Sequence, residues 1–124
     1  MEISTIIKSK EFDVVMGITI APQGSGLVLL EVTGEIQARF AGIGPGIYAN
    51  ISPIPGDTAT DFYFKLSSFN SIVRLGNTFI VRKVFPASRQ TNYYFNIAKD
   101  QWTTNVTEIQ LKNIVMTATF WPSS

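Results

Sequence analysis

The chain has 124 residues, of which 45% are hydrophobic and 15% charged, with a net charge of +1 and neither histidine nor cysteine. Histidine is the usual proton carrier near neutral pH, and both residue types are the preferred ligands of zinc, copper and haem iron, so most familiar catalytic and metal centres are excluded. The length suits one domain without disulfides, and a charged fraction below the roughly 25% of an average soluble domain indicates a surface suited to permanent partners.

The first half of the chain consists of short apolar runs that alternate with polar residues, which is the period of strands with one buried face. Predicted strands cover residues 3–7, 14–20, 27–33, 35–40 and 47–51. Between them, residues 22–26, 42–46 and 52–56 combine glycine, proline and serine, as turns do. Gly34 indicates a strand end or a bulge.

The second half continues this pattern, with predicted strands at residues 62–66, 79–85, 93–97, 108–112 and 114–120 and a turn at Gly76 and Asn77. Residues 67–75 are ambiguous. Apolar residues spaced four, three and four apart ahead of Gly76 are typical of a short helix, whereas the aromatic and β-branched residues around them favour a strand. The spaced residues are Phe62, Leu66, Phe69 and Val73. We expect an all-β, single-domain antiparallel β-sandwich or jelly-roll-like fold over residues 1–124, with eight to ten short strands and at most one short helix.

The charges are unevenly distributed along the chain. Residues 1–61 carry three positive and seven negative charges, a net of −4, and residues 62–99 carry six positive and none negative, a net of +6. Two interpretations stay open: the halves neutralise each other within one fold, or acidic and basic surfaces of different molecules meet. The second interpretation predicts assembly that weakens at high salt.

The sequence holds no strong phosphate-binding, metal-binding or catalytic motif. Residues 42–46 are glycine-rich, but Pro45 removes an amide that a phosphate loop would use. Asp57 and Asp61 supply too few carboxylates for a good calcium site, and Glu31 with Glu35 fits surface charge better than paired acid–base catalysis. We therefore expect no catalytic residues, no cofactor and no metal, and no enzymatic activity, with an enzyme of unrecognised type as a minor alternative.

Aromatic and basic residues near the C-terminal third are the best candidates for contact with a ligand or partner. They are Tyr93, Tyr94, Trp102, Arg82 and Arg89, with Asn92 as a polar neighbour. Flat aromatic rings stack on sugars or on nucleobases. A pI of about 8.0 argues against nucleic acid as a partner, because nucleic-acid-binding domains are usually more basic. In a strand, Tyr93 and Tyr94 point to opposite faces, one of them towards the core.

These observations predict a structural or assembly protein: a homo-oligomer, with a trimer favoured, that binds a larger assembly such as a bacteriophage capsid, as cement or decoration, or a tail. The alternative is a carbohydrate-binding module built on the aromatic residues. No signal peptide or membrane-spanning run is visible, which indicates synthesis in a host cytoplasm and a place in the virion, or otherwise a cytoplasmic protein. We expect residues 1–13 and 42–60 to contact neighbouring subunits, and Trp121 and Pro122 to be anchored against protein.

Overall fold

The computed structural model describes residues 5–6, 13–40, 46–65, 73–99 and 106–123. Within these ranges the chain forms eight strands and no helix, and every strand pairing is antiparallel. This confirms the predicted all-β sandwich. The strands are β1 (Thr5–Ile6), β2 (Asp13–Ile20), β3 (Gly26–Phe40), β4 (Gly46–Ser52), β5 (Phe62–Lys65), β6 (Val73–Ala87), β7 (Thr91–Lys99) and β8 (Val106–Pro122).

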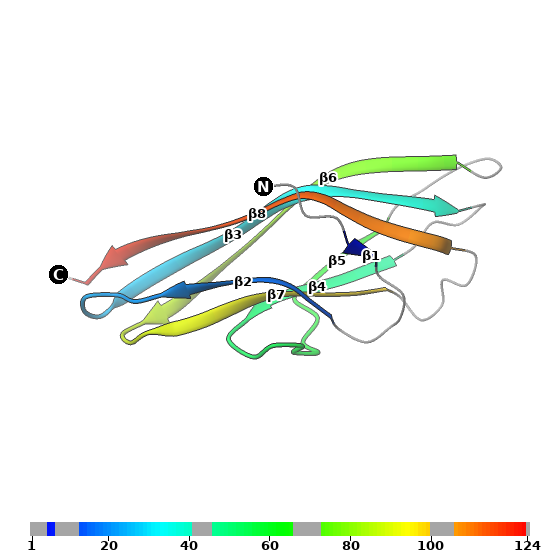
Figure 1. The fold of residues 1–124 in the computed structure, drawn as a ribbon. Coiled ribbons are helices and arrows are strands. Elements are labelled where there is room, and N and C mark those ends of the chain that lie inside the picture. The colour runs from blue at the N-terminus through cyan, green and yellow to red at the C-terminus, as the bar shows by residue number, and fades with distance from the viewer. Residues whose placement is uncertain (1–4, 7–12, 41–45, 66–72, 100–105, 124) are drawn as a thin grey trace.

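The strands form two four-stranded sheets that face each other (Figure 1). The first sheet has the order β1-β8-β3-β6 and the second has the order β2-β7-β4-β5. Six antiparallel pairings connect the strands of these sheets. Four of them are nested in the sequence, namely β1 with β8, β2 with β7, β3 with β6, and β4 with β5. A ribbon of nested pairs that wraps into two sheets in this way is a jelly roll, so the topology matches the jelly-roll-like expectation.

Three strands of the first sheet are longer than the sequence suggested. β3 and β6 have 15 residues each and β8 has 17. In β3 and in β8, two runs predicted as separate strands are continuous, and β6 begins before the strand predicted at residues 79–85. The predicted turn at Gly76 and Asn77 is wrong: these residues lie within β6, opposite Gln37 and Ile36 of β3. Pairing with a long neighbouring strand overrides the local turn preference of a glycine–asparagine step.

A bulge in β8 explains why Gly34 is present in the middle of β3. Thr33 pairs with Val115 but Glu35 pairs with Lys112, so β8 carries one extra residue, and Asn113 there has a φ of 54°. Asparagine tolerates this left-handed conformation better than most residues. The bulge turns Ile114 into the core, where its Cδ1 fills the space that a Cβ on residue 34 would need. Glycine is therefore needed at position 34, because it has no Cβ to collide with the Ile114 side chain.

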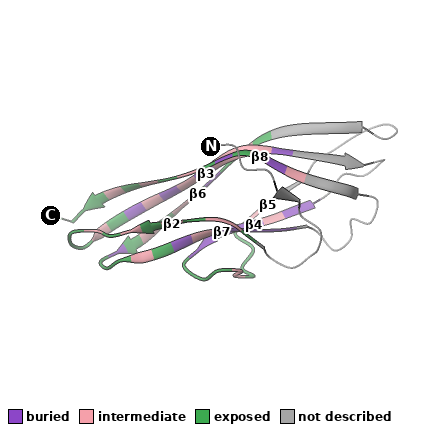
Figure 2. Ribbon diagram, viewed as in Figure 1, coloured by how far each residue is buried: buried purple, intermediate pink, exposed green. Residues whose placement is uncertain are grey.

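The core lies between the two sheets. The residues buried there come from the alternate positions of facing strands (Figure 2), chiefly Val28, Leu30, Val32, Ile36, Ile47, Ala49, Ile51, Val81, Phe95, Ile97, Leu111 and Ile114. Two ring pairs join the sheets: Phe79 with Phe95, 6.0 Å between centroids, and Phe85 with Tyr93, 4.9 Å. Aromatic pairs at such separations add to the stabilisation that burial provides.

Both ends of the described chain are held by the first sheet. Thr5 and Ile6 pair with Leu111 and Gln110 of the same chain, whereas residues 1–4 and 7–12 of the predicted contact segment lie outside the described residues. At the other end, β8 runs beside β3, and the Ser123 N–H donates to the Ser25 carbonyl at 2.8 Å. The ambiguous segment 67–75 is a strand from Val73 onward, and residues 66–72 are outside the described part. In the described ranges no helix has the length and apolar character to cross a membrane.

Candidate functional site

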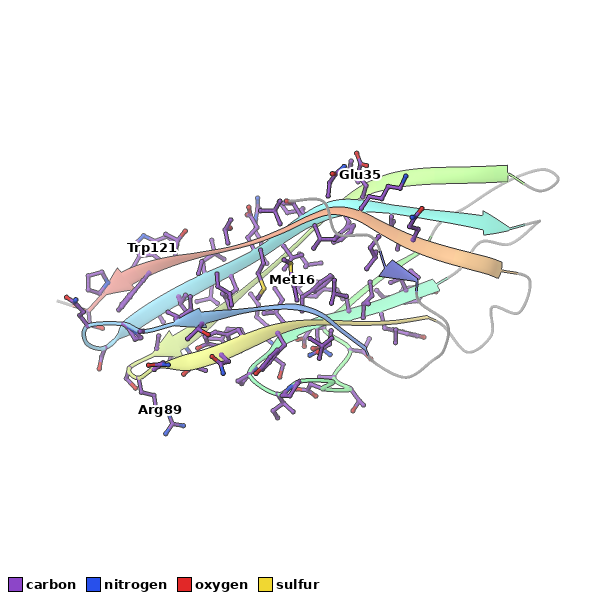
Figure 3. All side chains as sticks on the ribbon, in the orientation of Figure 1. Met16, Glu35, Arg89 and Trp121 are labelled. Carbon is purple, nitrogen blue, oxygen red and sulfur yellow. The ribbon has the colours of Figure 1, made fainter. Side chains whose placement is uncertain are left out.

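The side of the first sheet that faces away from the core is unusually apolar. We call the solvent side of β8, β3 and β6 the outer face. Five of the eight large hydrophobic residues most exposed in the described structure lie on it: Leu27, Ile80, Val84, Val115 and Trp121. Trp121 is 51% exposed and Val84 is 52% exposed, and Figure 3 shows the Trp121 side chain directed away from the second sheet. An exposed sheet of this kind indicates a contact surface.

The register of the three strands arranges the outer face in five rows, each with one residue from β8, β3 and β6. From the end near the C-terminus towards the middle of the sheet the rows are Trp121–Leu27–Pro86, Thr119–Leu29–Val84, Thr117–Glu31–Arg82, Val115–Thr33–Ile80 and Lys112–Glu35–Thr78. Two mainly apolar rows are therefore followed by a charged row, a mixed row and a second charged row.

The charges on the outer face balance. Glu31 and Arg82 form an ion pair at 2.6 Å within the third row, and Glu35 and Lys112 are register partners in the fifth. Asn113 also donates to the Glu35 carboxylate at 3.3 Å. With two acidic and two basic side chains, the five rows carry no net charge. The close pair Glu31 and Glu35 thus lies on an open sheet face beside Arg82, Lys112 and Asn113, and not in a cleft that could hold a substrate.

Part of the outer side of the second sheet, around Asn50 and Asn96, is covered instead by residues 53–60 in the loop that follows β4. Asn50 and Asn96 point away from the core on neighbouring strands, yet both are fully buried because this loop folds over them. Figure 1 shows the loop turning back beneath β4 and β7. Of the predicted contact segment 42–60, residues 42–45 lie outside the described part and the rest form β4 and this covering loop.

Hydrogen bonds from the two asparagines hold the loop in place. Asn96 Nδ2 donates to Asn50 Oδ1 at 2.8 Å and to the Ile54 carbonyl at 3.2 Å, while its Oδ1 accepts from the Gly56 N–H at 2.9 Å. Asn50 Nδ2 donates to the carbonyls of Asp57 and Ala59, each at 2.7 Å. In the described structure no buried side-chain nitrogen or oxygen lacks a partner, so this network is a complete structural clamp.

The two aspartates of the suggested calcium motif are used for other contacts. Asp57 accepts hydrogen bonds from the Ser52 hydroxyl at 2.6 Å and from the Ala59 N–H at 3.1 Å, and these bonds lower the pKa of its carboxyl. Asp61 forms an ion pair with Lys83 at 2.5 Å. Within the described residues, His, Cys, Asp and Glu form no group of three that could hold a metal ion.

Ion pairs connect the acidic and basic halves of the sequence. Asp61 with Lys83, and Glu31 with Arg82, each join a residue of the negative half to a residue of the positive half. Lys83 also lies over the Phe85 ring, with 5.2 Å from Nζ to the centroid. These contacts support neutralisation within one fold rather than acidic and basic surfaces held apart for different partners.

The predicted contact residues do not form one cluster. Tyr93 is 3% exposed and packs in the core, whereas Tyr94 is half-buried on the opposite side of β7, where its ring lies against Gly17. Arg82 is on the outer face, Arg89 is exposed in the turn between β6 and β7 (Figure 3), and Trp102 lies outside the described residues. The alternation correctly placed Tyr93 and Tyr94 on opposite faces. It did not reveal that the Tyr93 ring would be enclosed.

The outer face was missed by the sequence analysis, although a signal for it exists. Strands with one solvent-exposed face alternate between apolar and polar residues, yet residues 27–30, 79–81 and 114–116 are apolar at every position. Each of these runs places hydrophobic side chains both in the core and on the outer face. Continuous apolar runs of this kind indicate strands with hydrophobic side chains on both faces.

No protein-family model and no curated protein match this sequence. Among solved structures, one described as the structure of infectious bursal disease virus Gt strain is similar over 95% of this chain, with 17% identity and a TM-score of 0.48. The matched region is 30% of that protein's chain. A similarity of this size does not transfer function, because one β architecture serves many unrelated roles.

Proposed function

We propose that this protein is a non-enzymatic structural protein, a homo-oligomeric component of a virus particle such as a bacteriophage capsid cement, decoration or tail protein. The observation that carries the proposal is the outer face, where three long strands expose a neutral, apolar surface that ends in Trp121. Residues of this kind, tryptophan above all, dominate the energetics of protein interfaces.

Two further features support an assembly role. The sequence lacks histidine and cysteine, which removes the usual means of proton transfer and of thiol or transition-metal chemistry. The jelly roll is an architecture found in viral capsid domains and in lectins, so the fold is compatible with the proposal without deciding it.

The carbohydrate-binding alternative has lost part of its basis. A glycan platform needs aromatic rings that share one exposed surface. Tyr93 is enclosed between the sheets against Phe85, and Tyr94 lies on the far side of the same strand. In the described structure the two tyrosines therefore cannot stack on the same sugar.

Mass spectrometry and immunogold electron microscopy of particles purified from the native source test the proposal directly. We expect the protein in intact particles at a fixed ratio to the main shell protein, with label at regular positions. Its absence from particles would contradict the proposal. So would turnover of a defined substrate by the purified protein that is lost when one carboxylate or lysine is replaced.

A further inference from the structure

Resting on the assembly role proposed above, we propose that the outer face is a self-association surface. Two copies of this chain pack outer face against outer face, with their β3 strands aligned about a two-fold axis that runs parallel to β3. The occupant of the apolar surface is thus a second copy. Three properties of the face lead to this assignment: its charge, the order of its rows and its area.

The charge of the outer face favours a copy of itself over a charged partner. Glu31 forms an ion pair with Arg82, and Glu35 and Lys112 are register partners, so the face has no net charge with which to attract an anionic nucleic acid or membrane. A second copy is equally neutral. Two such faces can approach with the Glu31–Arg82 ion pair of each copy intact, so neither of these charges is buried without a partner.

The order of the rows selects the orientation. A two-fold axis parallel to β3 keeps each row opposite the same row of the second copy, and it exchanges β8 with β6. Trp121 then faces Pro86, Thr119 faces Val84, and Val115 faces Ile80. The two apolar rows of one copy thus pack on the same rows of the other, as in sandwiches whose sheets pack with aligned strands. Residues of β3 lie on the axis and face themselves, so Glu31 and Glu35 each approach the same glutamate of the second copy. Arg82 and Lys112 beside them offset these like charges.

The alternative two-fold axis, perpendicular to the strands, reverses the row order. It would place Leu27 against Glu35 and Trp121 against Lys112, so the two apolar rows would no longer pack on each other. An unpaired or poorly paired charge at an apolar contact opposes association. The aligned arrangement is therefore the favoured one.

The small area of the outer face limits how tightly two copies can bind. Five rows span about 27 Å along β3 and three strands span about 14 Å, which gives about 400 Å² per copy. Stable interfaces bury about 800 Å² per partner, so contact through these rows alone gives a weak pair. Association must depend on concentration, and a two-fold contact gives even numbers of copies, so a trimer would need a different contact.

The first experiment compares two exposed positions by light scattering and sedimentation over a range of concentrations. Val84→Lys places a charge on the outer face, and Ile54→Lys places the same charge at a 59% exposed position on the loop that covers the second sheet. We expect Val84→Lys to weaken pairing by about tenfold or more and Ile54→Lys to leave it unchanged. Both variants should unfold at the wild-type temperature, because both side chains are half exposed.

The second experiment tests the orientation with two complementary variants, Ile80→Lys and Val115→Asp. Each should fail to pair with itself, but an equimolar mixture should form a heterodimer. The reason is that the introduced lysine of one copy faces the introduced aspartate of the other only under the aligned axis. The reversed axis places position 80 opposite position 84, so the mixture would then stay monomeric. That result would overturn the proposed geometry.

The remaining outcomes separate this inference from the proposed function. Wild-type self-association that Val84→Lys leaves intact, or that Ile54→Lys weakens equally, would overturn the outer-face pairing while leaving an assembly role standing. A wild-type protein that stays monomeric at millimolar concentration but is present in particles would have the same meaning. A protein that is monomeric and also absent from particles would refute both.

Discussion

The clamp between the second sheet and the covering loop makes a sharp stability prediction. Asn96→Ala removes one side chain that contacts three groups: Asn50 Oδ1, the Ile54 carbonyl and the Gly56 N–H. The first of these is buried, and the other two belong to a partly buried loop. We expect this single truncation to destabilise the protein and to release residues 53–60.

The magnitude follows from the three lost hydrogen bonds. Leaving the buried Asn50 oxygen without its donor costs about 1–3 kcal/mol, and each partly buried loop bond contributes about 0.5–1.5 kcal/mol. The expected loss in the free energy of unfolding is therefore about 2–6 kcal/mol. This is a large fraction of the roughly 5–15 kcal/mol that typically stabilises a domain.

Asn92→Ala is the matched control. Asn92 lies on the same strand and faces the same side as Asn96, but it is exposed and accepts a hydrogen bond from the Thr19 hydroxyl at 2.7 Å. Water can replace that bond, so its removal should cost less than about 1 kcal/mol. Urea denaturation followed by circular dichroism measures both variants, and hydrogen exchange at the Gly56 amide reports the loop.

Equal stability of the two variants would refute the reasoning. It would mean that the buried asparagines do not hold the loop against the sheet. Slow exchange of the Gly56 amide in Asn96→Ala would contradict the role of this hydrogen bond even if the protein were globally destabilised.

Four further predictions follow from the bulge, from the loop and from the charges. Gly34→Ala should lower the free energy of unfolding by about 1–3 kcal/mol, measured by urea denaturation. Ile114→Val removes the Cδ1 that obstructs the new Cβ, so the double variant should lose less stability than the sum of the two single changes. Asn113→Ala should cost about 1 kcal/mol and Asn113→Gly little or nothing, because the φ of 54° suits glycine; equal losses in thermal melts would contradict this. The Ser52 hydroxyl lowers the pKa of Asp57 below 3.8, so the resulting stabilisation of the fold is present above pH 3.8 and is lost as the pH falls through the folded-state pKa. Ser52→Ala should raise the pKa of Asp57 in an NMR titration. An unchanged pKa would refute this role of Ser52. Self-association should change little between low and high salt in light scattering, since the charges of the outer face pair within each copy; steep weakening by salt would instead favour acidic and basic surfaces meeting between molecules.

Much of the fold was predictable because strand periodicity is local. The alternation around Ile36 and around Met116 identified strands that the structure contains, and Gly34 was recognised as the site of an irregularity. The continuation of β6 through Gly76 and Asn77 was not predictable from local periodicity. It depends on pairing with β3, a partner about forty residues away whose position no local pattern encodes.

The candidate site was predictable only in part. The sequence placed Tyr93 and Tyr94 on opposite faces, but which face becomes the core depends on the packing of the second sheet. The burial of Asn50 and Asn96 was not predicted, because no local pattern shows that the loop of residues 53–60 covers them. The outer face needed the register of three strands before its rows could be seen, since Trp121, Leu27 and Pro86 are far apart in the sequence.

Hydroxyl-radical footprinting with mass spectrometry tests the central claim, that this protein works by packing its outer face against protein, most directly. Labelling of Trp121 and Val84 is compared between dilute protein and the assembled particle, with the exposed Ile54 as the internal reference. The account predicts strong protection of Trp121 and Val84 in the assembly at unchanged labelling of Ile54. Equal labelling of Trp121 and Val84 in both states would contradict it.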